Sequence, residues 1–171
     1  TPMRPLKPLR PPPPDSPRFV SVSLPTGSPR AATMGAHLFR LPTYGRCSEV
    51  IQSVHAAPRQ PVDGNGMVHY ADPAWAAWQV GEDQSSGAVL GVCWHHRAYD
   101  LDTVRGDLPL PEYGEAVIEE MVDAGYTAAE YHHLAREVYA ALRSFHDAGR
   151  RAQAEAQVEG NGSPAPGPTS S

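Results

Sequence analysis

The residues of this chain that most resemble a chemical site lie in the segment VLGVCWHH, near the middle of the sequence. This segment places the thiol of Cys93 close to the imidazoles of His95 and His96. Thiolate sulfur and imidazole nitrogen are ligands that zinc prefers, and a structural zinc site needs four of them in a tetrahedron. Further ligands would have to come from His132 or His133. The pattern therefore predicts, as one alternative, a metal-binding domain or a metalloenzyme.

A structural role explains the same segment more simply. The sequence contains none of the CxxC, HExxH or GxSxG patterns of zinc and nucleophile sites. Neighbouring residues on a helix point about 100° apart, so only one of His132 and His133 can face inward. Cys93 is then a small buried hydrophobe, and Trp94 is an anchor of the packed core. On this interpretation we expect no metal, no other cofactor and no catalytic residue.

Charge and composition exclude several other classes. The formal net charge is −5, yet residues 1–33 carry five basic residues against one acidic residue, so the rest of the chain carries −9. Nucleic-acid binding depends on clustered lysine and arginine, and such an acidic body lacks them. The sequence also has no apolar run of a membrane span and no signal peptide, and its two cysteines make no disulfide framework. We therefore expect a cytoplasmic protein with no membrane or nucleic-acid partner.

Proline divides the chain into three parts. Ten of the 19 prolines lie in residues 1–33, and three more lie in the last eight residues. Proline removes an amide donor and fixes φ, so it prevents regular helix and sheet. We expect a disordered proline-rich arm at residues 1–33 and a disordered Gly/Pro/Ser tail at residues 152–171. Residues 34–151 are long enough to bury a core and form the expected folded domain.

The first half of this domain predicts short elements separated by turns. They are a strand at residues 37–41, helices at residues 47–57 and 72–81, a helix or strand at residues 87–94, and a tight turn in DGNG at residues 63–66. Asp72 suits the N-cap of the second helix, Pro73 its first position and Gly81 its end. Trp75 and Trp78 are three residues apart and therefore share one face of this helix.

Two amphipathic helices are predicted in the C-terminal third, the first at residues 112–125 and the second from residue 128 to about residue 149. Their apolar faces consist of Val117, Ile118, Met121 and Val122 in the first, and of Tyr131, Leu134, Val138, Leu142 and Phe145 in the second. Gly125 suits the C′ position of the first helix, and Thr127 with Glu130 forms a capping box for the second. The short connection implies an antiparallel or steeply crossed pair. The predicted fold is therefore a small, mainly α-helical domain with a C-terminal helix hairpin.

A helix pair joined at a glycine is also the pattern of a helix-turn-helix DNA-binding regulator, which is a further alternative. The second helix would then be basic or rich in amides where it enters the major groove. Instead it begins AAEYHH and carries only Arg136 and Arg143 along its predicted length. This composition argues against DNA binding.

Residues 78–145 resemble a known class of proteins. A tryptophan-containing helix is followed by AVLGVCW, by a loop ending in RGD, and by YGEAVIEEMVDAGYTAAEYHHLAREVYAAL. This order is similar to that of small helical proteins encoded among phage structural and tail genes, in particular the tail-assembly-chaperone-like class. The resemblance implies a small helical body that binds tape-measure or tail-tube proteins during virion assembly, with a flexible C-terminal tail. It implies no catalytic residues.

Together these observations predict a non-enzymatic adaptor or assembly protein whose partner is another protein, and a phage tail protein if the resemblance holds. It would act in the cytoplasm of the host cell. The expected protein-binding residues are aromatic. They are Trp75 and Trp78 on the helix predicted at residues 72–81, and Tyr113, Tyr131 and Tyr139 on the C-terminal helix pair.

Overall fold

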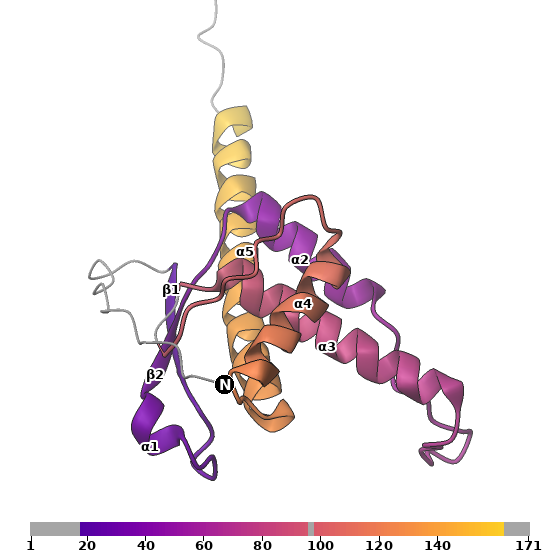
Figure 1. Ribbon diagram of the computed structural model, residues 1–171. Coiled ribbons are helices and arrows are strands. Elements are labelled where there is room, and N and C mark those ends of the chain that lie inside the picture. The colour runs from indigo at the N-terminus through magenta and orange to yellow at the C-terminus, as the bar shows by residue number, and fades with distance from the viewer. Residues whose placement is uncertain (1–17, 96–97, 163–171) are drawn as a thin grey trace, which may run out of the picture.

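The computed structural model describes residues 18–95 and 98–162, which form a mainly α-helical domain, as the sequence predicts. The elements in chain order are β1 (Phe19–Ser23), α1 (Ala31–Met34), β2 (Ala36–Arg40), α2 (Tyr44–Ala56), α3 (Pro73–Cys93), α4 (Leu110–Asp123) and α5 (Ala128–Gly162). Figure 1 shows α5 as a long upright helix, with the two-stranded sheet on its left and α2, α3 and α4 towards its right. The strand predicted at residues 37–41 is confirmed as β2.

The strand β1 corrects the predicted start of the domain. It pairs antiparallel with β2 over all five of its residues, and its Val20 and Val22 contribute to the core. The predicted disordered arm at residues 1–33 is therefore wrong from residue 18 onward. The prolines of this region flank the strand FVSVS and leave its backbone donors intact. Residues 1–17 lie outside the described part of the chain.

The helix α3 is a single element where the sequence predicts two, because both segments expected between residues 72 and 94 belong to it. Its start is as predicted: the side chain of Asp72 accepts a hydrogen bond of 2.9 Å from the backbone amide of Ala74. The predicted end at Gly81 is wrong. A Cβ atom at Gly81 would lie 2.7 Å from the ring of Pro58, so the lack of a side chain at Gly81 lets Pro58 pack closely against the middle of the helix.

The helix α4 packs chiefly against α3, and the two cross where both carry a glycine. A Cβ atom added at Gly87 would lie 1.7 Å from the carbonyl oxygen of Gly114. One added at Gly114 would lie 2.0 Å from the carbonyl oxygen of Gln84. The two backbones are therefore in direct contact at this crossing, and neither glycine leaves room for a side chain.

The turn between α4 and α5 has the predicted chemistry. Gly125 has φ of +95°, in the left-handed region that glycine adopts without strain. The amide of Thr127 donates to Oε1 of Glu130 at 2.8 Å, and the amide of Glu130 donates to Oγ1 of Thr127 at 3.3 Å. These two hydrogen bonds form the capping box that starts α5.

The apolar faces predicted for α4 and α5 supply much of the core. The buried members are Val117, Ile118, Met121, Tyr131, Leu134, Val138 and Leu142, with Phe145 packed against them. Val122 is an exception, because its side chain is 50 % exposed. It follows Met121 directly and is turned about 100° away from that buried position.

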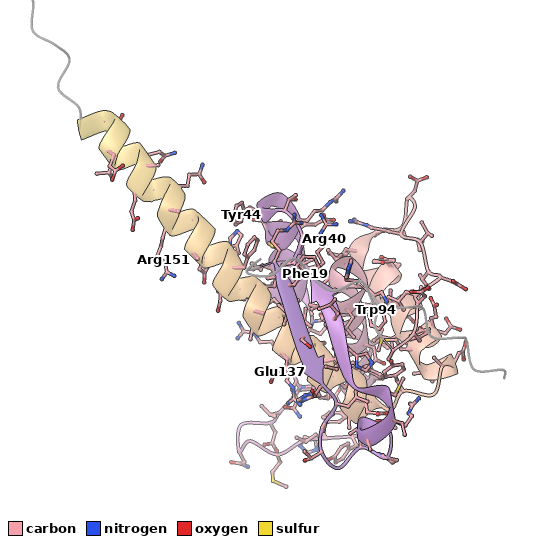
Figure 2. The ribbon with its side chains drawn as sticks, turned by 90° about the vertical axis from the view of Figure 1, so that its left-hand side faces the viewer. Phe19, Arg40, Tyr44, Trp94, Glu137 and Arg151 are labelled. Atoms are coloured by element: carbon pink, nitrogen blue, oxygen red, sulfur yellow. The ribbon has the colours of Figure 1, made fainter. Side chains whose placement is uncertain are left out.

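The helix α5 extends further than the sequence predicts. Its predicted end is near Gly149, with a disordered tail from residue 152, whereas the helix continues to Gly162. Figure 2 shows this end, which carries Arg151, projecting beyond the rest of the fold. Its sequence RRAQAEAQVE consists mostly of good helix formers, which favour helix without packing partners. Among the helices of the described residues, none is long and apolar enough to cross a membrane.

Candidate functional site

The segment VLGVCWHH joins α3 to the sheet. Val89, Leu90 and Cys93 are buried, which for Cys93 is what the structural interpretation of the segment predicts, while Val92 is only partly buried. The helix ends at Cys93, and Trp94 forms a short backbone bridge with Phe39 of β2. The rings of Trp94 and Phe39 also meet edge to face, with centroids 5.4 Å apart. Packing therefore accounts for the apolar residues of this segment.

The two histidines at the start of α5 have separate partners. Nδ1 of His132 is hydrogen-bonded to Oγ of Ser86 at 2.9 Å. Nε2 of His133 donates to the carbonyl oxygen of Ser23 at 3.0 Å, on the strand β1. As expected for neighbouring residues of a helix, the two imidazoles point to different parts of the fold.

Those of the proposed metal ligands that the structure describes do not gather into a site. His95 lies against Phe19, with ring centroids 5.2 Å apart, and His96 lies outside the described part of the chain. Within residues 18–95 and 98–162, no three side chains of His, Cys, Asp or Glu are placed to share a metal ion. Cys93, His95 and either His132 or His133 therefore do not form the metal site that was considered for them.

Both cysteine thiols are buried in the core. Burial, and to a smaller extent the neighbouring Cys47, raises the pKa of Cys93 to about 12. Burial also raises the pKa of Cys47, although the charge of Arg18 opposes that shift. Because the thiolate is the form that attacks electrophiles and binds metals, both groups are in their unreactive form at neutral pH.

We therefore expect neither Cys47 nor Cys93 to react rapidly with dithiobis(nitrobenzoic acid) in the folded protein. In denaturant both thiols should react, and the Cys93→Ser variant should then show one thiol fewer. The released chromophore, measured against time with and without denaturant, gives the number of accessible thiols. Rapid reaction of a thiol in the native protein would contradict this placement.

Three of the five aromatic residues predicted to bind a protein pack in the core or against it. Tyr113 is 6 % exposed and Tyr131 is 5 % exposed. The hydroxyl of Tyr131 donates to Oδ1 of Asp83 at 2.8 Å. Tyr139 is partly buried against the core, and its hydroxyl accepts a hydrogen bond from Arg143 at 3.4 Å. Aromatic residues on the inward face of an amphipathic helix serve the core, so these three tyrosines form no joint surface.

Trp75 and Trp78 lie in an exposed aromatic cluster at the start of α3. The ring centroid of Trp75 is 4.7 Å from that of Tyr70 and 4.7 Å from that of Trp78. Tyr70 is 74 % exposed, and both tryptophans are partly exposed. We call Tyr70, Trp75 and Trp78 the aromatic tip. Figure 1 shows that α3 begins at the lower right, on the side of the molecule away from α5.

Local hydrogen bonds order the chain that leads into the aromatic tip. Oδ1 of Asp63 accepts from the amides of Asn65 at 2.8 Å and Met67 at 2.9 Å, which confirms the turn predicted in DGNG. The bond from Met67, followed by those from His69 and Asn65, lowers the pKa of Asp63. The turn therefore holds its shape without burying much apolar surface.

Tyr70 was not predicted to belong to this cluster. It precedes the N-cap Asp72 by two residues, and the amide of Asp72 donates to the carbonyl oxygen of His69 at 3.1 Å. This bond turns the chain so that Tyr70 meets Trp75 in the first turn of α3. The position of this aromatic residue just before a strong N-cap residue was therefore the sequence signal that could have placed Tyr70 in the cluster.

No family model matches this chain, and neither a curated protein nor a solved structure matches it. Its function must therefore be inferred from its own residues and their geometry. The aromatic tip is the clearest candidate, since it is an ordered cluster of large apolar side chains at the surface.

Proposed function

We propose that this protein is a non-enzymatic adaptor that binds another protein through its aromatic tip. The observation that carries the proposal is the contact of Trp75 with both Tyr70 and Trp78 at the surface. Tryptophan and tyrosine most often dominate the binding energy of protein interfaces, because each brings a large apolar area with few rotatable bonds. A partner that covers this cluster would remove apolar surface from water, which favours association.

The resemblance of residues 78–145 to the tail-assembly-chaperone-like class supports a particular kind of partner. It favours a tail-tube or tape-measure protein of a phage, bound in the host cytoplasm during virion assembly. The hydrogen-bonded turn before the aromatic tip also supports binding, since an ordered loop loses less conformational entropy when a partner covers it.

The double variant Trp75→Ala/Trp78→Ala tests this function. We expect it to weaken binding by about 30-fold, because a central hot spot typically contributes 2 kcal/mol or more. The full chain is co-expressed with a phage tail-tube protein or a phage tape-measure protein, the two kinds of partner that the resemblance favours. Binding is first scored by co-purification and then measured by calorimetry with the purified pair.

The matched control is Tyr44→Ala. Tyr44 is 52 % exposed and lies on α2, where it stacks on Phe145 with centroids 4.9 Å apart. The Tyr44→Ala substitution therefore removes an exposed aromatic ring at a different surface and should leave the affinity for the partner unchanged. Equal affinity of the wild type and the double variant, with both folded by circular dichroism, would contradict binding through the aromatic tip.

A further inference from the structure

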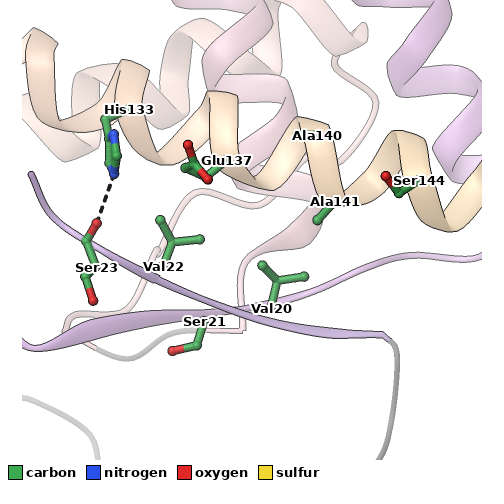
Figure 3. Close-up of a pocket in the computed structure, with 9 residues that line it drawn as sticks. All are labelled: Val20, Ser21, Val22, Ser23, His133, Glu137, Ala140, Ala141 and Ser144. Carbon is green, nitrogen blue, oxygen red and sulfur yellow. Dashed lines mark hydrogen bonds between the residues drawn. The ribbon is translucent and has the colours of Figure 1, made fainter.

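A groove of about 590 Å³ lies between β1 and α5, on the sheet side of the molecule. It is lined by Val20, Ser21, Val22 and Ser23 of β1 and by His133, Glu137, Ala140, Ala141 and Ser144 of α5. Figure 3 shows Val20 and Val22 pointing from the strand towards the helix, with Glu137 on the helix above them. This surface is separate from the aromatic tip, which lies at the start of α3.

One edge of β1 is paired with β2, and the pairing shows which backbone groups point away. The amide of Leu41 donates to the carbonyl oxygen of Arg18 at 2.6 Å. In an antiparallel pair, hydrogen-bonded residues alternate with residues that point outward. The backbone groups of Phe19, Ser21 and Ser23 therefore face the outer edge of β1.

This outer edge is on the groove side. The carbonyl oxygen of Ser23 is one of its groups, and it accepts the hydrogen bond from His133 of α5. In the described part of the chain the sheet has two strands, so no further strand covers this edge. The strand FVSVS also carries no proline and no charged side chain, which are the features that usually protect an exposed strand edge from pairing. The edge is thus open to pairing.

The groove is long enough for a short extended peptide. Its α5 wall runs over twelve residues, from His133 to Ser144, or about 16 Å along the helix axis. The five residues of β1 extend for about 17 Å. Ala140 and Ala141 lie along this wall, and their small side chains leave space above the strand.

Glu137 determines which peptide fits. Its carboxylate lines the groove, and among the described residues no arginine, lysine or histidine forms an ion pair with it. The chain after residue 33 also carries a net charge of −9. A lysine or arginine on the bound strand would therefore find a complementary charge at this point.

We propose that the outer edge of β1 binds an extended segment of a partner protein by strand addition. The bound segment carries a basic side chain that faces Glu137 and small side chains that lie over Ala140 and Ala141. Backbone hydrogen bonds to Phe19 and Ser21 supply affinity, and the side chains in the groove supply selectivity. This is a second protein-binding surface, and it does not depend on the aromatic tip.

Two other occupants fit the groove less well. A second copy of the chain would present its own β1, and FVSVS has no basic residue for Glu137. Residues 1–17 of the chain contain eight prolines, whose missing amides interrupt any ladder of strand hydrogen bonds.

A peptide titration of the full-length, 15N-labelled protein tests the proposal. The probe is an acetylated and amidated peptide of alternating valine and serine with a central lysine. We expect amide shifts in β1 and around Glu137, with the indole signals of Trp75 and Trp78 unchanged. Glu137→Lys should weaken binding of this peptide by about fivefold and strengthen binding of the same peptide with a central glutamate. Glu155→Lys is the matched control, because it makes the same charge change on the exposed end of α5 and should leave both affinities unchanged.

Methylation of the backbone amides of the peptide separates strand addition from simple charge attraction. The methylated peptide keeps every side chain but loses its donors, so we expect its affinity to fall by about tenfold or more. Ser21→Pro, which removes a donor on the outer edge, should have a similar effect, with Ser21→Ala as its control. Equal binding of the methylated peptide, shifts confined to the aromatic tip, or no binding of either peptide at millimolar concentration would overturn the proposal. Dimerisation that Ser21→Pro abolishes, seen by sedimentation without peptide, would overturn it in favour of a second copy.

Discussion

Replacing Gly114 with alanine should destabilise the fold by about 3 kcal/mol, at the upper end of the effects of overpacking. A Cβ atom there would lie 2.0 Å from the carbonyl oxygen of Gln84 and 2.7 Å from the amide nitrogen of Ala88. Both are backbone atoms inside α3, so no rotamer change can make room. The helices must instead move apart, and that movement disturbs the buried contacts on both sides of the crossing. Urea denaturation followed by circular dichroism measures the loss.

Gly45→Ala is the matched control for this prediction. Gly45 lies in the first turn of α2, is exposed, and has no atom within 4 Å of an added Cβ. Alanine there should leave stability unchanged or raise it by up to about 1 kcal/mol through its better helix propensity. Equal stability of the Gly114→Ala and Gly45→Ala variants would show that α3 and α4 do not cross as described.

The reciprocal variant gives a second test of the same crossing. Gly87→Ala should also be strongly destabilising, because its Cβ would lie 1.7 Å from the carbonyl oxygen of Gly114. Once one alanine has separated the helices, however, the second meets less resistance. The loss in the double variant should therefore be smaller than the sum of the two single losses, as expected for residues that share one contact.

The glycines also show what the sequence can and cannot predict. Gly125 was predicted to end α4, and its neighbours Thr127 and Glu130 were predicted to start α5, because caps depend on nearby residues alone. Gly81 has a similar sequence context, but its role is to admit the ring of Pro58. A glycine that allows close packing and one that ends a helix look the same until the tertiary partner is known. This explains why α3 was predicted as two elements.

The strand β1 could not be predicted for a related reason. Its five residues lie among prolines, and its stability comes from pairing with β2 and from burial of Val22 against the helices. Strand formation depends on such distant partners more than on intrinsic preference. The groove beside β1 was missed with it.

The aromatic residues divide in the same way. Trp75 and Trp78 were correctly placed on one face of a helix, but amphipathic pattern alone does not show which aromatic residues a core absorbs. Tyr113 and Tyr131 lie on faces that other helices cover, whereas the start of α3 extends past its neighbours.

Glu130 joins the N-terminal segment to the turn between α4 and α5, and its removal should have the second large effect. The side chain is only 3 % exposed. It accepts hydrogen bonds from Oγ of Ser28 and from the amide of Thr127, and it pairs with Arg30 at 3.4 Å. The guanidinium of Arg30 also lies 5.0 Å from the ring centroid of Tyr126. One buried carboxylate thus holds together segments that are about a hundred residues apart in sequence.

We expect Glu130→Ala to destabilise the protein by about 3 kcal/mol, since it removes one partner from a largely buried, hydrogen-bonded pair and also breaks the capping box. Glu130→Gln should be milder, because an amide keeps an acceptor for Ser28 but loses the charge that faces Arg30. The measurement is again urea denaturation at neutral pH, with Glu155→Gln on the exposed end of α5 as the control.

The dependence of stability on pH distinguishes the charge of Glu130 from its shape. Burial alone would raise the pKa of Glu130, but the hydrogen bonds from Ser28 and Thr127 and the charge of Arg30 outweigh burial and hold the pKa below the usual 4.5. The unfolded chain therefore binds this proton more readily than the folded chain does. The stabilisation is fully present above the usual glutamate pKa and is lost as the pH falls through the lower pKa of the folded state. Glu49 contributes to the same acid range, because hydrogen bonds from Arg105 and Arg46 lower its pKa, but its greater exposure makes its share smaller. The loss of stability between neutral and acid pH should therefore be clearly smaller in Glu130→Gln than in the wild type, in which Glu130 can take up a proton. An unchanged loss in that variant would show that the charge of Glu130 does not stabilise the fold.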